Sequence, residues 1–277
     1  MTVAVITDSA ASLPSDIAAG AGVTIVPLQL AIGGRSHRDG DLSLEELLER
    51  VDEGITTSSP TPGDFISALE RTDTGDGAVV LTVARTMSAT RDAAELAARN
   101  SDTDVRVVDT GTAAGAQGLV VLAAARAAQA GAPVDAVEAT ARAVAQRVRL
   151  VATLDSLDRL AKSGRVPEAA AWAGRWLHLN PLFEFRGGRA RPLRPARSRE
   201  AALERIAAEC RRAPNGGRLH VAALHALAVD DARTLLELLN AHVEPATALI
   251  APFSPVMVVH TGPNLVGMAW WREDQAD

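Results

Sequence analysis

Short apolar runs alternate with helical patterns through the first half of the chain. Helical spacing occurs at 42–54, 62–71, 88–100 and 111–131. This alternation predicts a parallel sheet with helical crossovers, in which ligands bind beyond the carboxyl ends of the strands. The strands, expected to be buried on both faces, are 3–7 (VAVIT), 23–32 (VTIVPLQLAI), 78–83 (AVVLTV) and 105–110 (VRVVDT).

The pattern changes near residue 149. Beyond it we expect a hairpin around Gly187-Gly188, a strand-like segment at 218–226 and two final apolar strands, with helical spacing over 149–164, 169–179, 199–213 and 230–243. We therefore predict an α/β protein of two domains. Residues 1–148 would form an N-terminal Rossmann-like domain with a parallel sheet, and residues 149–277 a C-terminal α+β domain with a mostly antiparallel sheet.

Polar residues follow three of the first four strands, at the edge where a ligand is expected. They are 7–9 (TDS), 86–88 (TMS) and 109–110 (DT). Ser88 also stands just before a helical pattern, which suits a capping residue. These positions make the carboxyl edge of the sheet the candidate binding region.

The segment 56–65 (TTSSPTPGDF) carries five hydroxyls and two prolines in ten residues. Thr61 is expected to cap a helix that begins at Pro62, with Asp64 three residues after the cap. Hydroxyls beside the free N–H groups of a helix start favour an anion. The segment therefore either holds an anionic head or forms a turn and cap that serve only the fold.

Two further segments carry candidate side chains. In 258–271 (VVHTGPNLVGMAWW), His260 follows an expected strand and precedes a Gly-Pro turn, so it either carries a proton or contacts an anion, or it caps the turn. In 160–166 (LAKSGRV), Gly164 is expected to end a helix, and Arg165 follows it.

An arginine-rich stretch surrounds the expected hairpin. Such a stretch is either a solvated surface hairpin or a contact for an acidic protein or phosphate. A nucleic-acid surface would also need interleaved aromatic residues and a basic chain, and the net charge here is −6. The arginines are Arg186, Arg189, Arg191, Arg194, Arg197 and Arg199.

Composition excludes several other classes of function. Hydrophobic residues make up 47% of the 277 and charged residues 22%, which is typical of a globular protein. The six histidines are scattered and Cys210 is the single cysteine, so no metal site is expected. The G-x-x-x-x-G-K-[ST] and G-x-S-x-G motifs are absent. The N-terminus lacks the pattern of a signal peptide and no apolar run is long enough to span a membrane, so we expect a cytoplasmic protein without stable membrane insertion.

Taken together and in order, eight segments resemble the DegV family of fatty-acid-binding proteins over nearly the whole chain. They are ITDSAASLP, HRDGDLSLEEL, TTSSPTPGDF, MSATRDAA, VVDTGTAAGAQG, LDRLAKSGRV, PLFEFRGGRARPLRPARSREAAL and HTGPNLVG. The sequence departs from the usual family pattern at Ala84 and Arg85, where a Ser-Ser pair is common, and at Ala89, where glycine is common.

The resemblance implies two α/β domains that bury an acyl chain between or within them. It implies that Thr57, with Ser58 adjacent, and Ser88 hold the carboxylate. It also implies a separate fatty acid kinase subunit that phosphorylates this carboxylate to an acyl phosphate for phospholipid synthesis. Arg197 and His260 match positions that serve this step or the docking of the kinase.

We therefore expect a non-catalytic carrier of a long-chain fatty acid of the palmitate or oleate class, with no cofactor or metal of its own. Arg165, Arg197 and His260 are expected near the mouth of its site. One alternative is an enzyme in which His260 acts as acid or base, oriented by Asp8 or Asp109. Another is a regulatory module whose arginine hairpin contacts an acidic protein.

Overall fold

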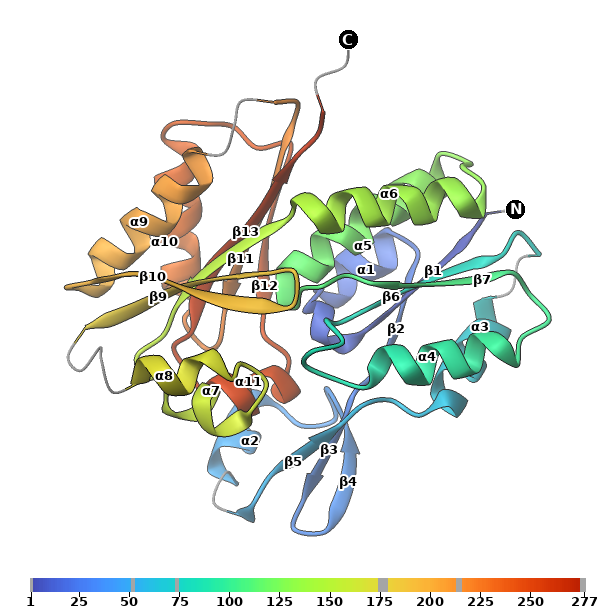
Figure 1. The fold of residues 1–277 in the computed structure, drawn as a ribbon, viewed down its shortest axis with the longest axis horizontal. Coiled ribbons are helices and arrows are strands. Elements are labelled where there is room, and N and C mark those ends of the chain that lie inside the picture. Colours follow the sequence, from blue (N-terminus) through green and yellow to red (C-terminus); the bar gives the residue numbers. More distant parts are fainter. Residues whose placement is uncertain (1, 51–52, 73–74, 174–178, 213–215, 275–277) are drawn as a thin grey trace.

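The fold is built on three β-sheets, shown in Figure 1. The computed structural model describes residues 2–50, 53–72, 75–173, 179–212 and 216–274. A four-stranded sheet comes from the first half of the chain, a six-stranded sheet comes from the second half, and a three-stranded sheet lies below them in the view of Figure 1.

The four-stranded sheet is parallel throughout, with the order β2-β1-β6-β7, which confirms the predicted α/β arrangement. Its strands are β1 (Ala4–Asp8), β2 (Val23–Val26), β6 (Ala78–Thr82) and β7 (Val105–Asp109). After β1 the chain forms the 3-10 turn η1 (Ser9–Ala11) and then α1 (Ser15–Gly20).

Helices cover both faces of this sheet because the strands are apolar on both sides. One face packs on α3 (Pro62–Thr72) and α4 (Thr90–Arg99) through a core that includes Ile6, Phe65 and Val80. The other face packs on α5 (Ala114–Gln129), which in turn packs on α6 (Val134–Arg147). The predicted cap of α3 is confirmed, since Thr61 Oγ1 accepts the Asp64 N–H at 3.2 Å and the Asp64 carboxylate accepts the Thr61 N–H at 2.8 Å.

The prediction of one strand over 23–32 is wrong. Residues 23–26 form β2, whereas β3 (Gln29–Ile32) belongs to the three-stranded sheet, between β4 (Arg35–Arg38) and β5 (Thr56–Ser58). Pro27 separates the two strands and, lacking an N–H, cannot extend the β2 ladder. The change of sheet carries the chain toward α2 (Leu44–Glu49), which begins with a capping box of Ser43 and Glu46.

The six-stranded sheet has the order β10-β9-β8-β13-β11-β12 and is antiparallel except for the β11–β12 pair, as predicted. The hairpin predicted at Gly187-Gly188 is confirmed between β9 and β10, and both glycines have positive φ. Helices α9 (Arg199–Arg211) and α10 (Val229–Asn240) cover one face. The strands are β8 (Arg149–Thr153), β9 (Asn180–Arg186), β10 (Arg189–Ala196), β11 (Leu219–His225), β12 (Thr247–Pro252) and β13 (Val266–Arg272).

Two more predictions in this half are wrong. Residues 149–153 form β8 instead of a helix, and only α7 (Asp158–Ser163) is helical within 149–164. His260 does not follow a strand, because Pro255–Thr261 form the helix α11. Pro255 at the first helical position favours this start, although the apolar run after it suits a strand equally well.

The helix predicted over 169–179 corresponds to α8 (Glu168–Ala173), and its remainder includes residues 174–178, which lie outside the described part of the chain. Position 148 lies between α6 and β8, and the division into domains there stays a prediction. No helix within the described residues is both long and apolar enough to cross a membrane.

Helix α5 joins the two large sheets, since it contacts β1 and β6 of one and β11 and β13 of the other. Gly115, in its first turn, makes this close approach possible. A Cβ atom placed there would lie 2.3 Å from Leu224 Cδ2 and 2.9 Å from Ala222 Cβ. The absence of a side chain at Gly115 therefore allows α5 to pack directly on the six-stranded sheet.

Replacing Gly115 by alanine is expected to destabilise the protein by roughly 1–3 kcal/mol, because the added methyl group overpacks this contact. A urea titration of G115A measures the change in the free energy of unfolding. Gly20→Ala is the control, since Gly20 ends α1 and a Cβ there meets nothing within 4 Å. Unfolding midpoints that are equal for G115A and the unaltered protein would contradict this account of α5.

Candidate functional site

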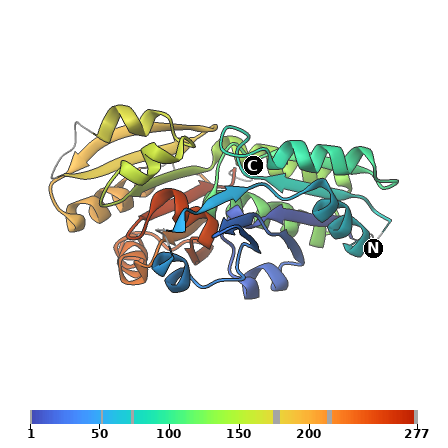
Figure 2. The same ribbon diagram turned by 90° about the horizontal axis from the view of Figure 1, so that it is seen from below.

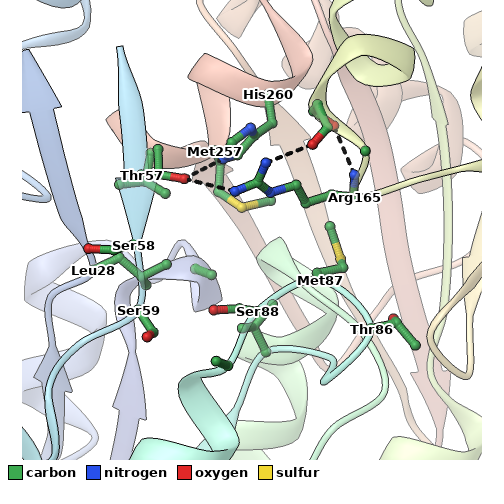
Figure 3. A pocket seen from close by; sticks show the side chains of 16 residues that line it. Leu28, Thr57, Ser58, Ser59, Thr86, Met87, Ser88, Arg165, Met257 and His260 are labelled. Carbon is green, nitrogen blue, oxygen red and sulfur yellow. Dashed lines mark hydrogen bonds between the residues drawn. The ribbon is translucent and has the colours of Figure 1, made fainter.

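A pocket of about 460 Å³ lies where the carboxyl edge of the four-stranded sheet meets β5, α11 and the end of α7. Figure 3 shows its side chains, and Figure 2 shows α11 and β5 in the middle of the molecule. The volume is within the usual range for small-molecule sites. The pocket is lined by Ala10, Leu28, Thr57, Ser58, Ser59, Val83, Thr86, Met87, Ser88, Ala89, Ser163, Gly164, Arg165, Val256, Met257 and His260.

Thr57, in the middle of β5, lies at the centre of a polar group (Figure 3). Its Oγ1 atom is 2.8 Å from Nε2 of His260 and 3.5 Å from Nη2 of Arg165. The Arg165 guanidinium also donates to the Ser163 carbonyl at 2.7 Å, which fixes its direction. Gly164 makes this turn possible as the left-handed C-cap of α7, with φ of 69°, as predicted.

Ser88 lies on the loop between β6 and α4, on another side of the same pocket (Figure 3). Its Oγ atom accepts the Thr90 N–H at 3.3 Å and lies 2.8 Å from Thr90 Oγ1. Helix α4 starts at Thr90, so the residue in the capping position is Ala89, one residue later than expected. Ser88 therefore bonds the start of the helix while its side chain lines the pocket.

His260 is electrically neutral at neutral pH. Burial, and secondarily the positive charge of Arg165, lower the pKa of the imidazole from 6.5 to about 4. A neutral imidazole has one N–H donor and one acceptor nitrogen. In the tautomer that carries the proton on Nε2, His260 donates to Thr57 Oγ1.

That tautomer leaves the Thr57 hydroxyl proton free for a ligand, because the oxygen then accepts from both His260 and Arg165. The same reasoning applies to Ser88 when the Thr90 hydroxyl donates to it. Both oxygens then have their donors within the protein, and both hydroxyl protons are available to an acceptor in the pocket. The arrangement suits an anion that accepts hydrogen bonds, such as a carboxylate.

Neither carboxylate proposed to orient His260 contacts it. The buried Asp8 side chain accepts the N–H groups of Ala10 at 3.0 Å and Val83 at 2.8 Å, and burial raises its pKa to about 6. Asp109 accepts the N–H groups of Gly111 and Arg85 instead. Asp8 therefore holds two residues that line the pocket, and neither carboxylate acts on the imidazole.

The structure brings five of the six predicted site residues into one pocket: Thr57, Ser58, Ser88, Arg165 and His260. Arg197 is exposed, just beyond the end of β10, and does not line it. The roles assigned to these residues stay predictions. Among the described residues, no group of three or more His, Cys, Asp or Glu side chains is arranged to hold a metal ion.

Sequence reasoning missed the apolar wall formed by Leu28, Val256 and Met257, and the carboxylate of Asp39 behind it. The family resemblance includes Asp39 within HRDGDLSLEEL but gives no reason to place it near His260. Met257 lies in an apolar run whose pattern predicts a strand, although the run forms α11.

Comparison with known proteins gives one consistent result. A family model described as "Uncharacterised protein, DegV family" matches residues 2–273. A DegV domain-containing protein of Streptomyces coelicolor is 35% identical over 272 residues, covering 96% of this chain and 97% of its own.

Solved structures agree. A DegV family protein from Thermus thermophilus, described as binding a fatty acid, matches with a TM-score of 0.92 and 30% identity, over 99% of this chain and 100% of its own. A DegV lipid-binding protein from Thermotoga maritima matches with a TM-score of 0.87 and 26% identity, over 100% of both chains.

The low pKa of His260 makes the stability of the protein depend on pH. As pH falls from about 6.5 to about 4, the unfolded chain takes up a proton at His260 and the folded protein does not. This contribution to stability is therefore complete above pH 6.5 and is lost toward pH 4. We expect the free energy of unfolding of the unaltered protein to fall relative to that of His260→Asn over this range.

Denaturant titrations at a series of pH values measure this difference. His242→Asn, at an exposed position just after α10, is the control for the loss of a histidine. If the difference in the free energy of unfolding between the unaltered protein and H260N stays constant from pH 7 to pH 4, burial does not lower the pKa of His260 in the folded protein.

Proposed function

The chain belongs to the DegV family, and we propose that it binds a long-chain fatty acid with the carboxylate in the pocket between Thr57 and Ser88. The observation that carries this proposal is the pair of pocket-lining hydroxyls, of which Thr57 accepts from Arg165 and Ser88 accepts from the Thr90 N–H. The fatty-acid-binding relative from Thermus thermophilus, at 30% identity, supports the ligand class.

The acyl tail supplies most of the affinity. Burial of about 15 methylene groups yields roughly 12 kcal/mol before ordering costs, at ~0.8 kcal/mol each. A hydrogen bond to the charged carboxylate contributes about 1.5–3 kcal/mol. The hydroxyls therefore fix the position of the head, and the tail lies against the apolar wall that Leu28, Val256 and Met257 begin.

Neutral donors suit a carboxylate that has to react afterwards. A guanidinium fork that grips both oxygens would occupy the atom that must attack a phosphate. Arg165 is held by the Ser163 carbonyl and reaches Thr57. In this proposal it gives the pocket a positive potential and leaves the carboxylate oxygens to the hydroxyls.

We propose further that the chain is a carrier that presents this carboxylate to a separate fatty acid kinase subunit, which forms the acyl phosphate. ATP and Mg²⁺ belong to that subunit, and the carrier has no cofactor of its own. Arg197 is exposed outside the pocket, and in this proposal it contacts the kinase or a phosphate. An acid–base role for His260 has less support, because its pKa of about 4 lies far from neutral pH.

Thr57→Val and Ser88→Ala are each expected to weaken fatty-acid affinity about tenfold or more, since each removes one hydrogen bond to a charged group. Competition with a fluorescent fatty acid measures this affinity on lipid-free protein. Thr140→Ala is the matched control, because this hydroxyl lies on α6 outside the pocket. Equal affinities in all four proteins would place the carboxylate somewhere else.

With fatty acid, ATP and Mg²⁺, the chain alone is expected to form no acyl phosphate, and product is expected only when a fatty acid kinase subunit is added. Hydroxylamine trapping measures the product. Arg197→Ala is expected to slow the reaction without changing fatty-acid affinity, whereas Arg212→Ala, at the exposed end of α9, leaves the rate unchanged. Acyl phosphate formed by the chain alone would refute the carrier proposal.

A further inference from the structure

Asp39 is a carboxylate that ties together several walls of the pocket without lining it. It directly follows β4, and its own N–H donates to the Leu28 carbonyl at 2.8 Å. Its Oδ2 atom accepts the Ser9 hydroxyl at 2.6 Å, and its Oδ1 atom accepts the Val256 N–H at 3.0 Å. Ser9 Oγ in turn accepts the Leu28 N–H at 3.0 Å.

These partners are the pocket wall or its immediate neighbours. Leu28 and Val256 line the pocket, and Ser9 precedes Ala10, which also lines it. Ser9 and Leu28 come from the first half of the chain and Val256 from the second. The carboxylate therefore holds the two halves of the pocket together at one point.

The contact with Val256 also sets the position of His260. Both residues lie on α11, one helical turn apart, so an anchor at the first turn fixes where the imidazole lies. Asp39 belongs to the same hairpin as β3, and β3 pairs with β5 at Leu30 and Thr57. Asp39 thus connects the strand that carries Thr57 to the helix that carries His260.

Its location makes the bond to Val256 hard to replace. The Val256 N–H lies in the first turn of a short helix, where no backbone acceptor within the helix is available. Val256 as a whole is 2% exposed, so little water reaches this N–H. Asp39 itself is half-buried, and this burial raises the pKa of its carboxyl above the ordinary value.

We propose that Asp39 is a positioning residue of the headgroup site: by binding Ser9 and the start of α11, it sets the 2.8 Å contact between His260 and Thr57. It orients the Thr57 hydroxyl without touching the ligand. Its effect on ligand affinity rests on the proposed function, whereas its effect on His260 does not.

The test compares lipid-free Asp39→Ala with Asp41→Ala. Asp41 lies two residues away on the same turn, and its carboxylate accepts the exposed Arg38 N–H without contacting α11. An NMR titration follows the His260 imidazole in each protein. In D39A, α11 loses its anchor and the imidazole becomes hydrated, so its pKa is expected to rise from about 4 toward 6.5. In D41A it is expected to stay near 4.

Fatty-acid affinity gives the second measurement. D39A is expected to bind about tenfold more weakly, as for the loss of one hydrogen bond at Thr57. Asp39→Asn keeps an acceptor for Val256 and a donor toward Ser9. In this variant the pKa of His260 is therefore expected to stay near 4, and the fatty-acid affinity within about twofold of that of the unaltered protein. If D39N, unlike D39A, retains the low pKa of His260 and the affinity, the hydrogen bonds of residue 39 and not its charge position α11.

A folded D39A whose His260 titration and affinity match those of the unaltered protein would overturn the proposal. If D39A fails to fold, Ser9→Ala replaces it, because it removes one side of the same connection and is expected to shift the titration in the same direction. An unchanged titration in S9A would then count against the proposal. A protein that binds no fatty acid would refute the proposed function, and the titration would still judge Asp39.

Discussion

A hydroxyl can donate to a carboxylate only when its single proton is not already given to a neighbouring acceptor, and this requirement organises the pocket. Thr57 accepts from Arg165, and also from His260 when the imidazole proton is on Nε2. Ser88 accepts from the Thr90 N–H, and also from the Thr90 hydroxyl when that group donates. In the proposed function the imidazole has to be neutral to avoid a fixed ion pair with the ligand, and burial beside Arg165 keeps it so. The strength of each bond is modest, and the direction of each proton decides what the pocket accepts.

The rest of the fold brings distant segments to that point. Thr57 lies on a small sheet that exists because the chain leaves the parallel sheet after Val26. His260 lies on a helix 203 positions later in the sequence. Helix α5 joins the two large sheets through a glycine contact, and Asp39 joins α11 to the small sheet. A glycine contact and one half-buried carboxylate thereby hold together the elements around the pocket.

Local structure could be predicted from the sequence where a single residue determines the backbone conformation. The cap at Thr61, the left-handed Gly164 and the glycine hairpin at 187–188 are of this kind, and the alternation of apolar and helical segments gave the parallel sheet. Features that depend on packing against distant parts of the chain could not be predicted from the sequence. Pro27 divides an apolar run between two sheets, and the run before His260 forms a helix because Pro255 stands at its first position and its apolar side chains are packed. Periodicity cannot distinguish a short buried strand from a short buried helix.

The site follows the same division. The hydroxyls of 56–65 form an unusual cluster, and Ser88, Arg165 and His260 stand at expected ends of strands or helices. The family resemblance assigned these residues to one site, and all of them line one pocket. Arg197 does not line this pocket because it follows β10, the edge strand of the six-stranded sheet. Asp39 escaped notice since its importance depends on partners 30 and 217 positions away.

Native mass spectrometry of the purified protein determines whether a fatty acid occupies the pocket. We expect an added mass of one fatty acid, which denaturation releases and lipid analysis identifies as a long-chain acid. A protein that carries no such mass and takes up no added fatty acid would not be a fatty-acid carrier.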